Sequence, residues 1–509
     1  MKMFDASRND LCLGIVGAGL MGRGMAQIAA QAGIQVVLFD NSPETAETAR
    51  LTIAEVLGKL SAKGKIDYLE ASAAAARITV ADSLTKFERC HVVIEAIIEN
   101  LDAKRELFRR LEEVVSDTCL LATNTSSLSV TEIAATCKLP GRLGGFHFFN
   151  PVPVMKVVEV IDGVRSESWV GSALGELAVR FGHTPVRAKD SPGFIVNHAG
   201  RGFLTEALRI VGEGIADFSQ VDGILRGAGF KLGPFELLDL TGLDVSYPVM
   251  EAIYNQYYQE PRYRPSLIAR QRLVAGLLGR KTGQGFYKYA DGKKLIESPE
   301  EVPDAAVVMK PIWVGSSNSP FREEVIRLIE AKGALVDKGE RPTAESICIV
   351  LPIGLDVTTA ALSEKLDPAK TIGIDPLHLD GQVTLMKTPV TAADVSLAVR
   401  SIFASNGTSP ICIHDSPGFV AQRVKAMIVN IGCDMAQQRI ATPSDIDRAV
   451  TLGLGYPMGP LTMGDSMGAK VVLQILEELN DFYRDPRYRP SPWLIRRARL
   501  GVSLLTPEN

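Results

Sequence analysis

The chain has 509 residues, 46% of them hydrophobic and 22% charged, with a formal net charge of −4. This composition is typical of a globular protein of roughly three to four domains, and the slightly acidic balance argues against nucleic-acid binding. No hydrophobic run is long enough to cross a membrane, and no cleavable signal pattern is present at the N-terminus.

Seven cysteines, at positions 12, 90, 119, 137, 348, 412 and 433, are odd in number. They show neither a CxxC spacing nor the ligand spacing of a metal site. We therefore expect reduced thiols, no structural metal and a cytoplasmic protein.

A glycine-rich motif follows the first predicted strand, residues 11–16. Residues 17–22 read Gly-Ala-Gly-Leu-Met-Gly, a helical pattern follows, and a second predicted strand, residues 35–39, ends in Asp40. In such a motif the glycines permit a tight turn, the approach of a pyrophosphate and close helix packing, while the acid accepts the ribose hydroxyls. The pattern predicts an NAD site rather than a glycine turn that binds nothing. Its predicted contacts are Gly17, Gly19, Leu20, Met21, Gly22 and Asp40.

A helical region rich in alanine is expected from Ser42 to Arg77. Three lysines, Lys59, Lys63 and Lys65, surround a glycine turn within it. A solvent-exposed helix face is the favoured interpretation. The alternative is an electrostatic grip on a phosphate-bearing substrate.

Polar residues follow two further predicted strands. Residues 91–98 form a hydrophobic strand interrupted by Glu95 and followed by Glu99, and residues 119–122 are followed by a polar segment, residues 123–127. Ligands lie at the carboxyl ends of strands in open α/β sheets. We therefore expect these polar segments to border a site.

His147 ends the next hydrophobic run, before a bend containing Pro151 and Pro153. Glu159 lies twelve residues later in a second hydrophobic run, where a carboxylate is costly unless it has a partner. A carboxylate can hold one imidazole nitrogen and raise the basicity of the other. A core histidine beside an unrelated glutamate would fit equally well, but the neighbouring polar segments favour a catalytic histidine.

Together these segments resemble the L-3-hydroxyacyl-CoA dehydrogenases. The resemblance covers residues 11 to about 290 and is carried by the glycine motif and by residues 93–99, 124–128, 147–153, 190–197 and 233–244. It implies NAD-dependent oxidation of the 3-hydroxyl of an L-3-hydroxyacyl-CoA to the 3-oxoacyl-CoA.

The resemblance also implies roles for single residues. His147 would be the general base, oriented by Glu159. Ser126 and Asn197 would contact the substrate, and Glu99 and Lys104 would lie on the nicotinamide side. One local departure is His198, where the family often has arginine.

The remainder of the chain is a degraded second copy. The segment Asp-Ser-Pro-Gly-Phe begins at positions 190 and 415, and Pro-Arg-Tyr-Arg-Pro-Ser begins at 261 and 486, both 225 residues apart. We therefore predict an α/β Rossmann domain (1–188), an all-α domain (189–292), a reduced Rossmann-like domain (304–413) and a second all-α domain (414–509). Residues 291–303 would be the linker between the copies.

The second copy has lost the residues expected of a site. Residues 314–320 replace the glycine motif, Gln422 replaces Asn197, and the histidine at 378 is followed twelve residues later by Val390 instead of an acid. We expect this half to bind no cofactor and to catalyse nothing. Its helical domain would instead pair internally with the first helical domain, in addition to any homo-oligomer.

Such an arrangement is similar to that of the long bacterial members of the family. Some of these act on 3-hydroxyadipyl-CoA or 3-hydroxybutyryl-CoA in the degradation of fatty acids or of aromatic compounds such as phenylacetate. Two alternatives remain at this point: a dehydrogenase of another small hydroxy acid, and a non-catalytic dinucleotide-binding protein.

Overall fold

The computed structural model describes residues 4–295, 310–315, 319–404 and 409–508. The chain forms two compact units, one containing residues 1–198 and 438–454, the other residues 199–437 and 455–509. Each is described by itself.

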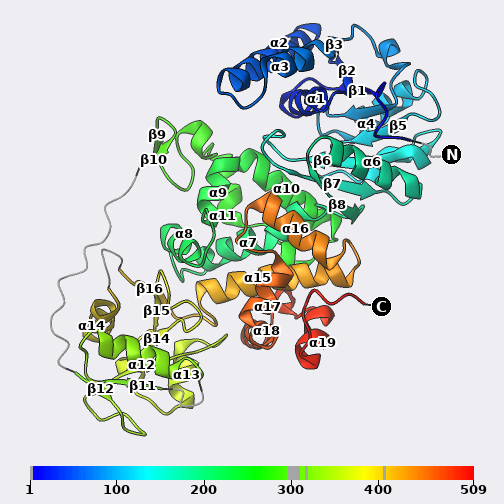
Figure 1. Ribbon diagram of the computed structural model, residues 1–509. Helices are drawn as coiled ribbons and strands as arrows, with labels where there is room; N and C mark the ends of the chain where they lie inside the picture. The colour runs from blue at the N-terminus through cyan, green and yellow to red at the C-terminus, as the bar shows by residue number, and fades with distance from the viewer. Residues whose placement is uncertain (1–3, 296–309, 316–318, 405–408, 509) are drawn as a thin grey trace. The chain divides into compact units, whose positions relative to one another are not determined.

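The first unit contains an eight-stranded sheet with the order β3-β2-β1-β4-β5-β6-β7-β8 (Figure 1). All neighbours run parallel except β6 and β7. The strand order reverses between β1 and β4, which is where ligands bind in sheets of this type. The strands are β1 (Cys12–Val16), β2 (Gln35–Phe39), β3 (Ile78–Val80), β4 (Val92–Glu95), β5 (Leu120–Thr123), β6 (Leu143–Phe148), β7 (Val157–Asp162) and β8 (Thr184–Lys189).

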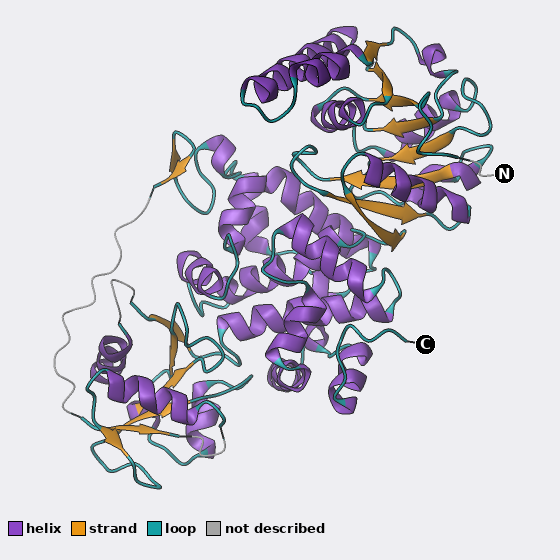
Figure 2. Ribbon diagram, in the orientation of Figure 1, coloured by secondary structure: helices purple, strands orange, loops and turns teal. Residues whose placement is uncertain are grey.

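Helices lie on both faces of this sheet (Figure 2). They are α1 (Leu20–Gln31), α2 (Pro43–Ala62), α3 (Tyr68–Ala76), α4 (Leu101–Leu111), α5 (Val130–Ala134) and α6 (Ser168–Arg180), with short 3₁₀ turns η1 (Leu84–Phe87) and η2 (Pro140–Arg142). Phe146 and Phe148 of β6 join one hydrophobic core with residues of α1 and α6. Because side chains alternate along a strand, His147 between them points to the opposite face.

Strand β4 is shorter than the sequence predicts. It ends at Glu95, whereas residues 91–98 were expected to be strand, and Ile98 is exposed. One carboxylate oxygen of Glu95, Oε1, accepts a hydrogen bond from the backbone N–H of Ile97 at 2.8 Å. This contact turns the chain out of the sheet directly after Glu95.

Helix α16 (Pro443–Leu454) belongs to the first unit although it is distant in sequence. It packs against β7 and β8, and a methyl group added at Gly453 would touch the side chain of Val196. The predicted boundary at residue 414 assigns this helix to the second helical domain. The four predicted domain boundaries stay a prediction.

The second unit contains two sets of helices. The first set is α7 (Val196–Gly212, which begins in the first unit), α8 (Phe218–Gly227), α9 (Pro234–Thr241), α10 (Leu243–Gln256), η3 (Pro261–Tyr263), α11 (Leu267–Val274) and η4 (Arg280–Thr282). The second set is α15 (Val420–Gln437), α17 (Pro460–Met467), α18 (Ala469–Tyr483), η6 (Pro486–Tyr488) and α19 (Pro492–Leu500).

Helices α7 and α15 are in close contact. A methyl group added at Gly202 would lie 2.9 Å from the backbone of Ile428, so only glycine permits this approach. Glu206 of α7 is fully buried, accepts hydrogen bonds from Arg423 of α15 at 2.9 and 2.7 Å, and lies 3.2 Å from Arg487. Burial would raise the pKa of Glu206, but the charges of Arg423 and Arg487 hold that pKa below its usual value.

A second sheet, with the order β12-β11-β13-β14-β15-β16, lies between the two sets of helices in the sequence. Its elements are β11 (Ile312–Val314), α12 (Arg322–Ala331), β12 (Val336–Asp337), β13 (Ile347–Val350), α13 (Val357–Ser363), η5 (Pro368–Lys370), β14 (Thr371–Ile374), β15 (Thr384–Lys387), α14 (Ala393–Phe403) and β16 (Ile411–His414). As in the first sheet, the last strand but one runs antiparallel to its predecessor and parallel to the edge strand. The predicted fold class, Rossmann then all-α then reduced Rossmann-like then all-α, is confirmed.

An equivalent helix-capping contact occurs within each of the two copies. The carboxylate of Asp190 accepts the backbone N–H groups of Val130 and Thr131 at the start of α5. The carboxylate of Asp415, 225 residues later, accepts those of Val357 and Thr358 at the start of α13. Both acids therefore cap the equivalent helix of their own copy, as a duplication requires.

The residue that corresponds to His147 in the second sheet is not His378. Gly145 pairs with Ile161 in the first sheet, and Gly373 pairs with Met386 in the second. Counting two residues on from each glycine, and two back from each partner, places Asp375 in the position of His147 and Thr384 in that of Glu159. The constant spacing used to compare His378 with Val390 was wrong, because the paired residues Gly373 and Met386 are 13 positions apart in the chain, whereas Gly145 and Ile161 are 16 apart.

Part of the predicted linker, residues 291–303, forms regular secondary structure. Residues Tyr289–Ala290 (β9) and Lys293–Lys294 (β10) form an antiparallel hairpin. The remainder of the linker, residues 296–303, lies outside the described residues, as do residues 316–318 of the segment expected to replace the glycine motif.

Candidate active site

The glycine motif forms the turn between β1 and α1. Gly17 has a φ of 104°, and its N–H donates to the carbonyl of Phe39 at 2.8 Å. A methyl group at Gly22 would lie 1.8 Å from the carbonyl oxygen of Gly17, so only glycine lets the helix start this close to the strand. A methyl group at Gly19 would meet no protein atom within 4 Å.

The N-terminus of α1 faces that open space. Gly19 is the N-cap residue, and no side chain caps the helix. The first backbone N–H groups of α1 therefore keep their hydrogen-bonding capacity for a ligand, and the helix dipole favours an anion there. Among the predicted contacts, Leu20 is exposed at this end and Met21 packs against the core. These features fit a dinucleotide pyrophosphate.

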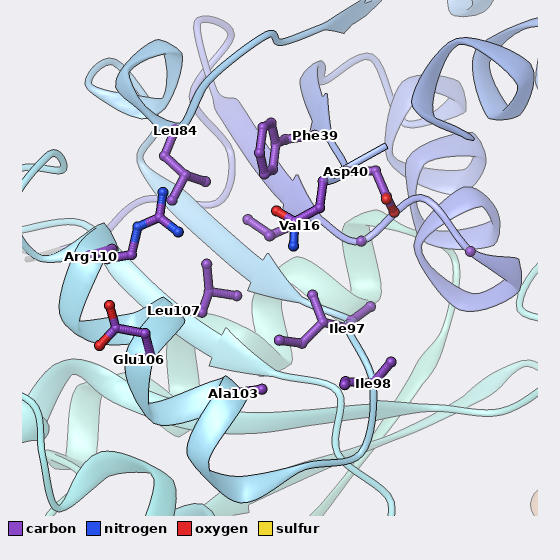
Figure 3. Close-up of a pocket in the computed structure, with 14 residues that line it drawn as sticks. Val16, Phe39, Asp40, Leu84, Ile97, Ile98, Ala103, Glu106, Leu107 and Arg110 are labelled. Atoms are coloured by element: carbon purple, nitrogen blue, oxygen red, sulfur yellow. The ribbon is translucent and has the colours of Figure 1, made fainter. Parts of the chain in front are cut away.

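A cavity of about 470 Å³ continues from the glycine turn. Figure 3 shows side chains from β1, β2 and α4 around it, with Asp40 at the end of β2. Asp40 accepts the N–H groups of Ala18 at 2.8 Å and Ser42 at 3.0 Å. These bonds fix the carboxylate beside a largely hydrophobic cavity, an arrangement that suits a ribose next to an adenine ring.

Lys104 is a buried cation held between two acids. Its Nζ lies 2.5 Å from Glu95 Oε1 and 3.3 Å from Glu99 Oε2. Glu95 is fully buried and also accepts the Thr123 hydroxyl at 2.6 Å. The family resemblance implied a place on the nicotinamide side for Glu99 and Lys104. It did not indicate that Glu95, the acid within the hydrophobic strand, makes the shorter contact.

Glu99 organises the loop that follows β5. Its Oε1 accepts hydrogen bonds from the Thr125 hydroxyl at 2.6 Å and from the N–H groups of Ser126 at 2.8 Å and Ser127 at 2.9 Å. Burial would raise the pKa of Glu99, but the charge of Lys104 and these hydrogen bonds lower it below its usual value. Glu99 is thus an anion that holds Ser126 in place.

His147 and Glu159 lie directly opposite each other on β6 and β7. The Nδ1 atom of His147 is 2.6 Å from Oε2 of Glu159, and both side chains are buried. The other oxygen, Oε1, accepts the N–H groups of Ile195 at 2.9 Å and Val196 at 2.8 Å, at the start of α7. The contact predicted from the spacing is present. Because the carboxylate of Glu159 is the acceptor facing Nδ1, the ring proton belongs on Nδ1 and the lone pair on Nε2.

Two asparagines connect the loop after β5 to the segments that flank this pair. Asn197, in the first turn of α7, donates from Nδ2 to the backbone carbonyl of Ser126 at 3.4 Å. Asn124 accepts the N–H of Phe148 at 2.9 Å and ties the loop after β5 to the end of β6. The sequence predicted a place near the substrate for Asn197 but no role for Asn124. Its position directly after a strand was the available signal.

The three lysines around Gly64, after helix α2, are exposed. Lys59 pairs with Glu55 at 2.5 Å on the surface of α2, and Lys63 and Lys65 follow the end of that helix. A grip on a phosphate stays a prediction for them.

Comparison with known proteins agrees with this geometry. Residues 12–191 match the model of the 3-hydroxyacyl-CoA dehydrogenase NAD binding domain, and residues 193–289 and again 418–503 match that of the C-terminal domain. The chain belongs to the 3-hydroxyacyl-CoA dehydrogenase family. It is an NAD-dependent 3-hydroxyacyl-CoA dehydrogenase with a duplicated C-terminal domain.

Relatives cover both the whole chain and its first half. A 3-hydroxyadipyl-CoA dehydrogenase of Escherichia coli K12 is 36% identical over 498 residues, which are 97% of this chain and 98% of the relative. A probable 3-hydroxybutyryl-CoA dehydrogenase of Deinococcus radiodurans is 40% identical over 277 residues, 54% of this chain and 99% of the relative.

A solved structure also spans the whole dehydrogenase. The crystal structure of 3-hydroxybutyryl-CoA dehydrogenase from Escherichia coli K12 superposes with a TM-score of 0.84 and 33% identity, covering 97% of this chain and 99% of that one. Within the described residues, none of the helices of this dehydrogenase combines the length and hydrophobicity needed to cross a membrane.

Proposed function

We propose that His147 is the general base that removes the proton of the substrate's 3-hydroxyl group. The single observation that carries this proposal is the buried contact between His147 Nδ1 and Glu159 Oε2 at 2.6 Å. Because Nδ1 donates to the carboxylate, Nε2 holds the free lone pair and is the atom that accepts the proton. When bound, NAD+ supplies the acceptor for the hydride that leaves C3.

Glu159 positions the ring and balances its charge. Its Oε1 is fixed by the N–H groups of Ile195 and Val196, so Oε2 remains directed at His147. The imidazolium that forms on proton transfer then lies beside a buried anion, which stabilises it more strongly than water would. General-base catalysis of this kind contributes on the order of 10²–10⁴-fold.

Ser126 and Asn197 position the substrate's oxygen atoms. They are joined by the hydrogen bond from Asn197 Nδ2 to the Ser126 carbonyl at 3.4 Å, and Glu99 holds the loop of Ser126 from the other side. Gly17, Gly19, Gly22 and the residues between them hold the pyrophosphate, and Asp40 accepts the ribose hydroxyls. Lys104, between Glu95 and Glu99, supports the nicotinamide side of the site.

The second half of the chain has a structural role in this proposal. Asp375 and Thr384 stand where the first half has His147 and Glu159, so the histidine–glutamate pair has no counterpart at those positions. The contacts of α7 with α15 support internal pairing of the two helical domains. All seven cysteines are free thiols, which supports a reducing compartment such as the cytoplasm.

An assay of NADH absorbance tests the substrate class of the proposed reaction. Purified enzyme is given NAD+ and a panel of L-3-hydroxyacyl-CoAs of increasing chain length, including one with a terminal carboxylate. The corresponding free hydroxy acids are the controls. We expect turnover with the thioesters and little with the free acids. Equal turnover of free hydroxy acids would contradict the assignment of the substrate class.

A further inference from the structure

A chain of three titratable side chains lies at the carboxyl end of β14. Asp375 is fully buried, and its Oδ2 lies 3.0 Å from Nδ1 of His378. The Nε2 atom of His378 lies 2.8 Å from Nζ of Lys425, in the second turn of α15. No part of the proposed dehydrogenase mechanism uses these residues.

The hydrogen bonds of Asp375 settle which atom of His378 carries the proton. The other oxygen, Oδ1, accepts from Gln422 Nε2 at 2.9 Å and from the N–H of Leu377 at 3.1 Å. Burial would raise the pKa of Asp375, but the contact with His378 and the hydrogen bonds from those two donors lower it. Asp375 is therefore an anion that accepts a hydrogen bond from the Nδ1–H of His378, so Nε2 holds the lone pair and can accept a proton from Lys425.

Lys425 has the properties of a nucleophilic amine. Burial lowers its pKa, and the charge of Asp375 opposes this shift only in part. Each unit of such a shift increases the neutral, nucleophilic fraction of a lysine about tenfold at neutral pH. The side chain is nevertheless partly exposed, so a reagent from solution can reach it. A base hydrogen-bonded to the nucleophile and itself oriented by a carboxylate is the arrangement of an activated nucleophile.

We propose that Lys425 is an acyl-acceptor site that reacts with acyl-CoA thioesters, with His378 as its base and Asp375 as the residue that orients His378. The proposal rests on the proposed function only for the class of reagent, since acyl-CoA thioesters are the molecules that such an enzyme meets. The modification is distinct from the dehydrogenase reaction, because it needs neither a 3-hydroxyl group nor NAD+.

The step is a simple acyl transfer. The lone pair of neutral Lys425 Nζ attacks the thioester carbonyl carbon and forms a C–N bond. The proton released from Nζ passes to Nε2 of His378. The C–S bond then breaks, the thiolate of CoA leaves, and His378 returns the proton to that sulfur. The products are an amide at Lys425 and free CoA-SH, with no change in oxidation state.

The test uses the full-length enzyme and acetyl-CoA, which has no 3-hydroxyl group and so is not a dehydrogenase substrate. Peptide mass spectrometry follows acetylation of Lys425 and of Lys470, an exposed lysine in the same unit, over time in one sample. We expect Lys425 to react at least about tenfold faster than Lys470, because general-base help of this kind contributes on the order of 10²–10⁴-fold. Equal rates at the two lysines would overturn the proposal.

Variants and unfolding distinguish activation of Lys425 by His378 and Asp375 from simple exposure of the Lys425 side chain. His378→Asn keeps a polar side chain but has no base, so the rate at Lys425 should fall by at least about tenfold. Asp375→Asn should lower it by a smaller factor. In urea-unfolded wild-type protein the two lysines should react equally, which tests the relay even if a variant does not fold. A fast reaction that survives His378→Asn, or that persists in urea, would show that the Asp–His–Lys chain does not activate the amine.

Discussion

Replacing Glu159 with glutamine tests how the structure sets the proton position on His147. In the wild type, Glu159 Oε1 accepts two backbone N–H groups and Oε2 accepts the ring N–H. Glutamine has one oxygen for these three donors. If that oxygen stays with the two backbone groups, the amide NH₂ faces the ring, and Nδ1 must become an acceptor.

The energies decide which arrangement the variant adopts. Turning the amide around would leave two buried N–H groups without an acceptor, at a cost of about 1–3 kcal/mol each. Moving the ring proton from Nδ1 to Nε2 breaks no hydrogen bond, so the ring should adopt this tautomer. His147 then has a proton on Nε2 and no lone pair to receive the substrate's proton. The loss equals the general-base contribution, about 10²–10⁴-fold in turnover.

Steady-state kinetics at saturating NAD+ provide the measurement. Asp162→Asn is the matched control, since it changes a carboxylate on the same strand that pairs with Arg187 instead. The double variant with His147→Ala should be little slower than His147→Ala alone, because groups that act as a unit are not additive. A loss below about tenfold for Glu159→Gln, or fully additive losses in the double variant, would refute the tautomer argument.

The remaining predictions concern the cofactor, the two copies and their pairing. Wild-type enzyme should strongly prefer NAD+, and Asp40→Asn should raise kcat/KM for NADP+ relative to that for NAD+. Comparable kcat/KM values for the two cofactors in the wild type would mean that Asp40 does not face the ribose. Asn197→Ala should lower kcat/KM about tenfold or more. Gln422→Ala should lower the melting temperature but leave kcat/KM within about twofold. An equal loss of kcat/KM in the two variants would show that the second copy takes part in catalysis. Glu206→Gln should lower the free energy of unfolding at pH 7 by about 3–5 kcal/mol in urea titrations, because Arg423 loses its buried partner. Since the pKa of Glu206 is lowered in the folded state, this stabilisation is present above the unfolded pKa of about 4.3 and is lost as the pH falls through the folded pKa, so the two proteins should converge in acid. A difference that persists in acid would contradict the ion-pair explanation.

Local patterns in the sequence predict the first sheet and much of its site. The glycine motif requires close approach at Gly17 and Gly22, and such a requirement is visible in residue types alone. The pairing of His147 with Glu159 could be predicted because a buried acid on a strand needs a partner and the two strands are consecutive. Both features depend on residues that are near in sequence.

Features that depend on distant segments could not be predicted in the same way. The contact of α16 with β7 and β8 joins parts of the chain more than 250 residues apart, and no local pattern encodes it. The position of Asp375 was missed because the paired residues of β14 and β15 lie closer together in the sequence than those of β6 and β7, which only strand pairing shows. The buried contact of Glu95 with Lys104 is local, nine residues apart, and was missed because the acid was taken as the middle of a longer strand instead of its last residue.

The central claim is that His147 is the base of this dehydrogenase, and the variant His147→Ala tests it most directly. Its turnover with an L-3-hydroxyacyl-CoA should be compared with its affinity for NADH, measured by fluorescence titration. We expect turnover to fall by about 10²–10⁴-fold while the affinity for NADH stays within about twofold, because the proposed cofactor contacts lie on other residues. Turnover within about tenfold of the wild type, with NADH binding intact, would contradict the account.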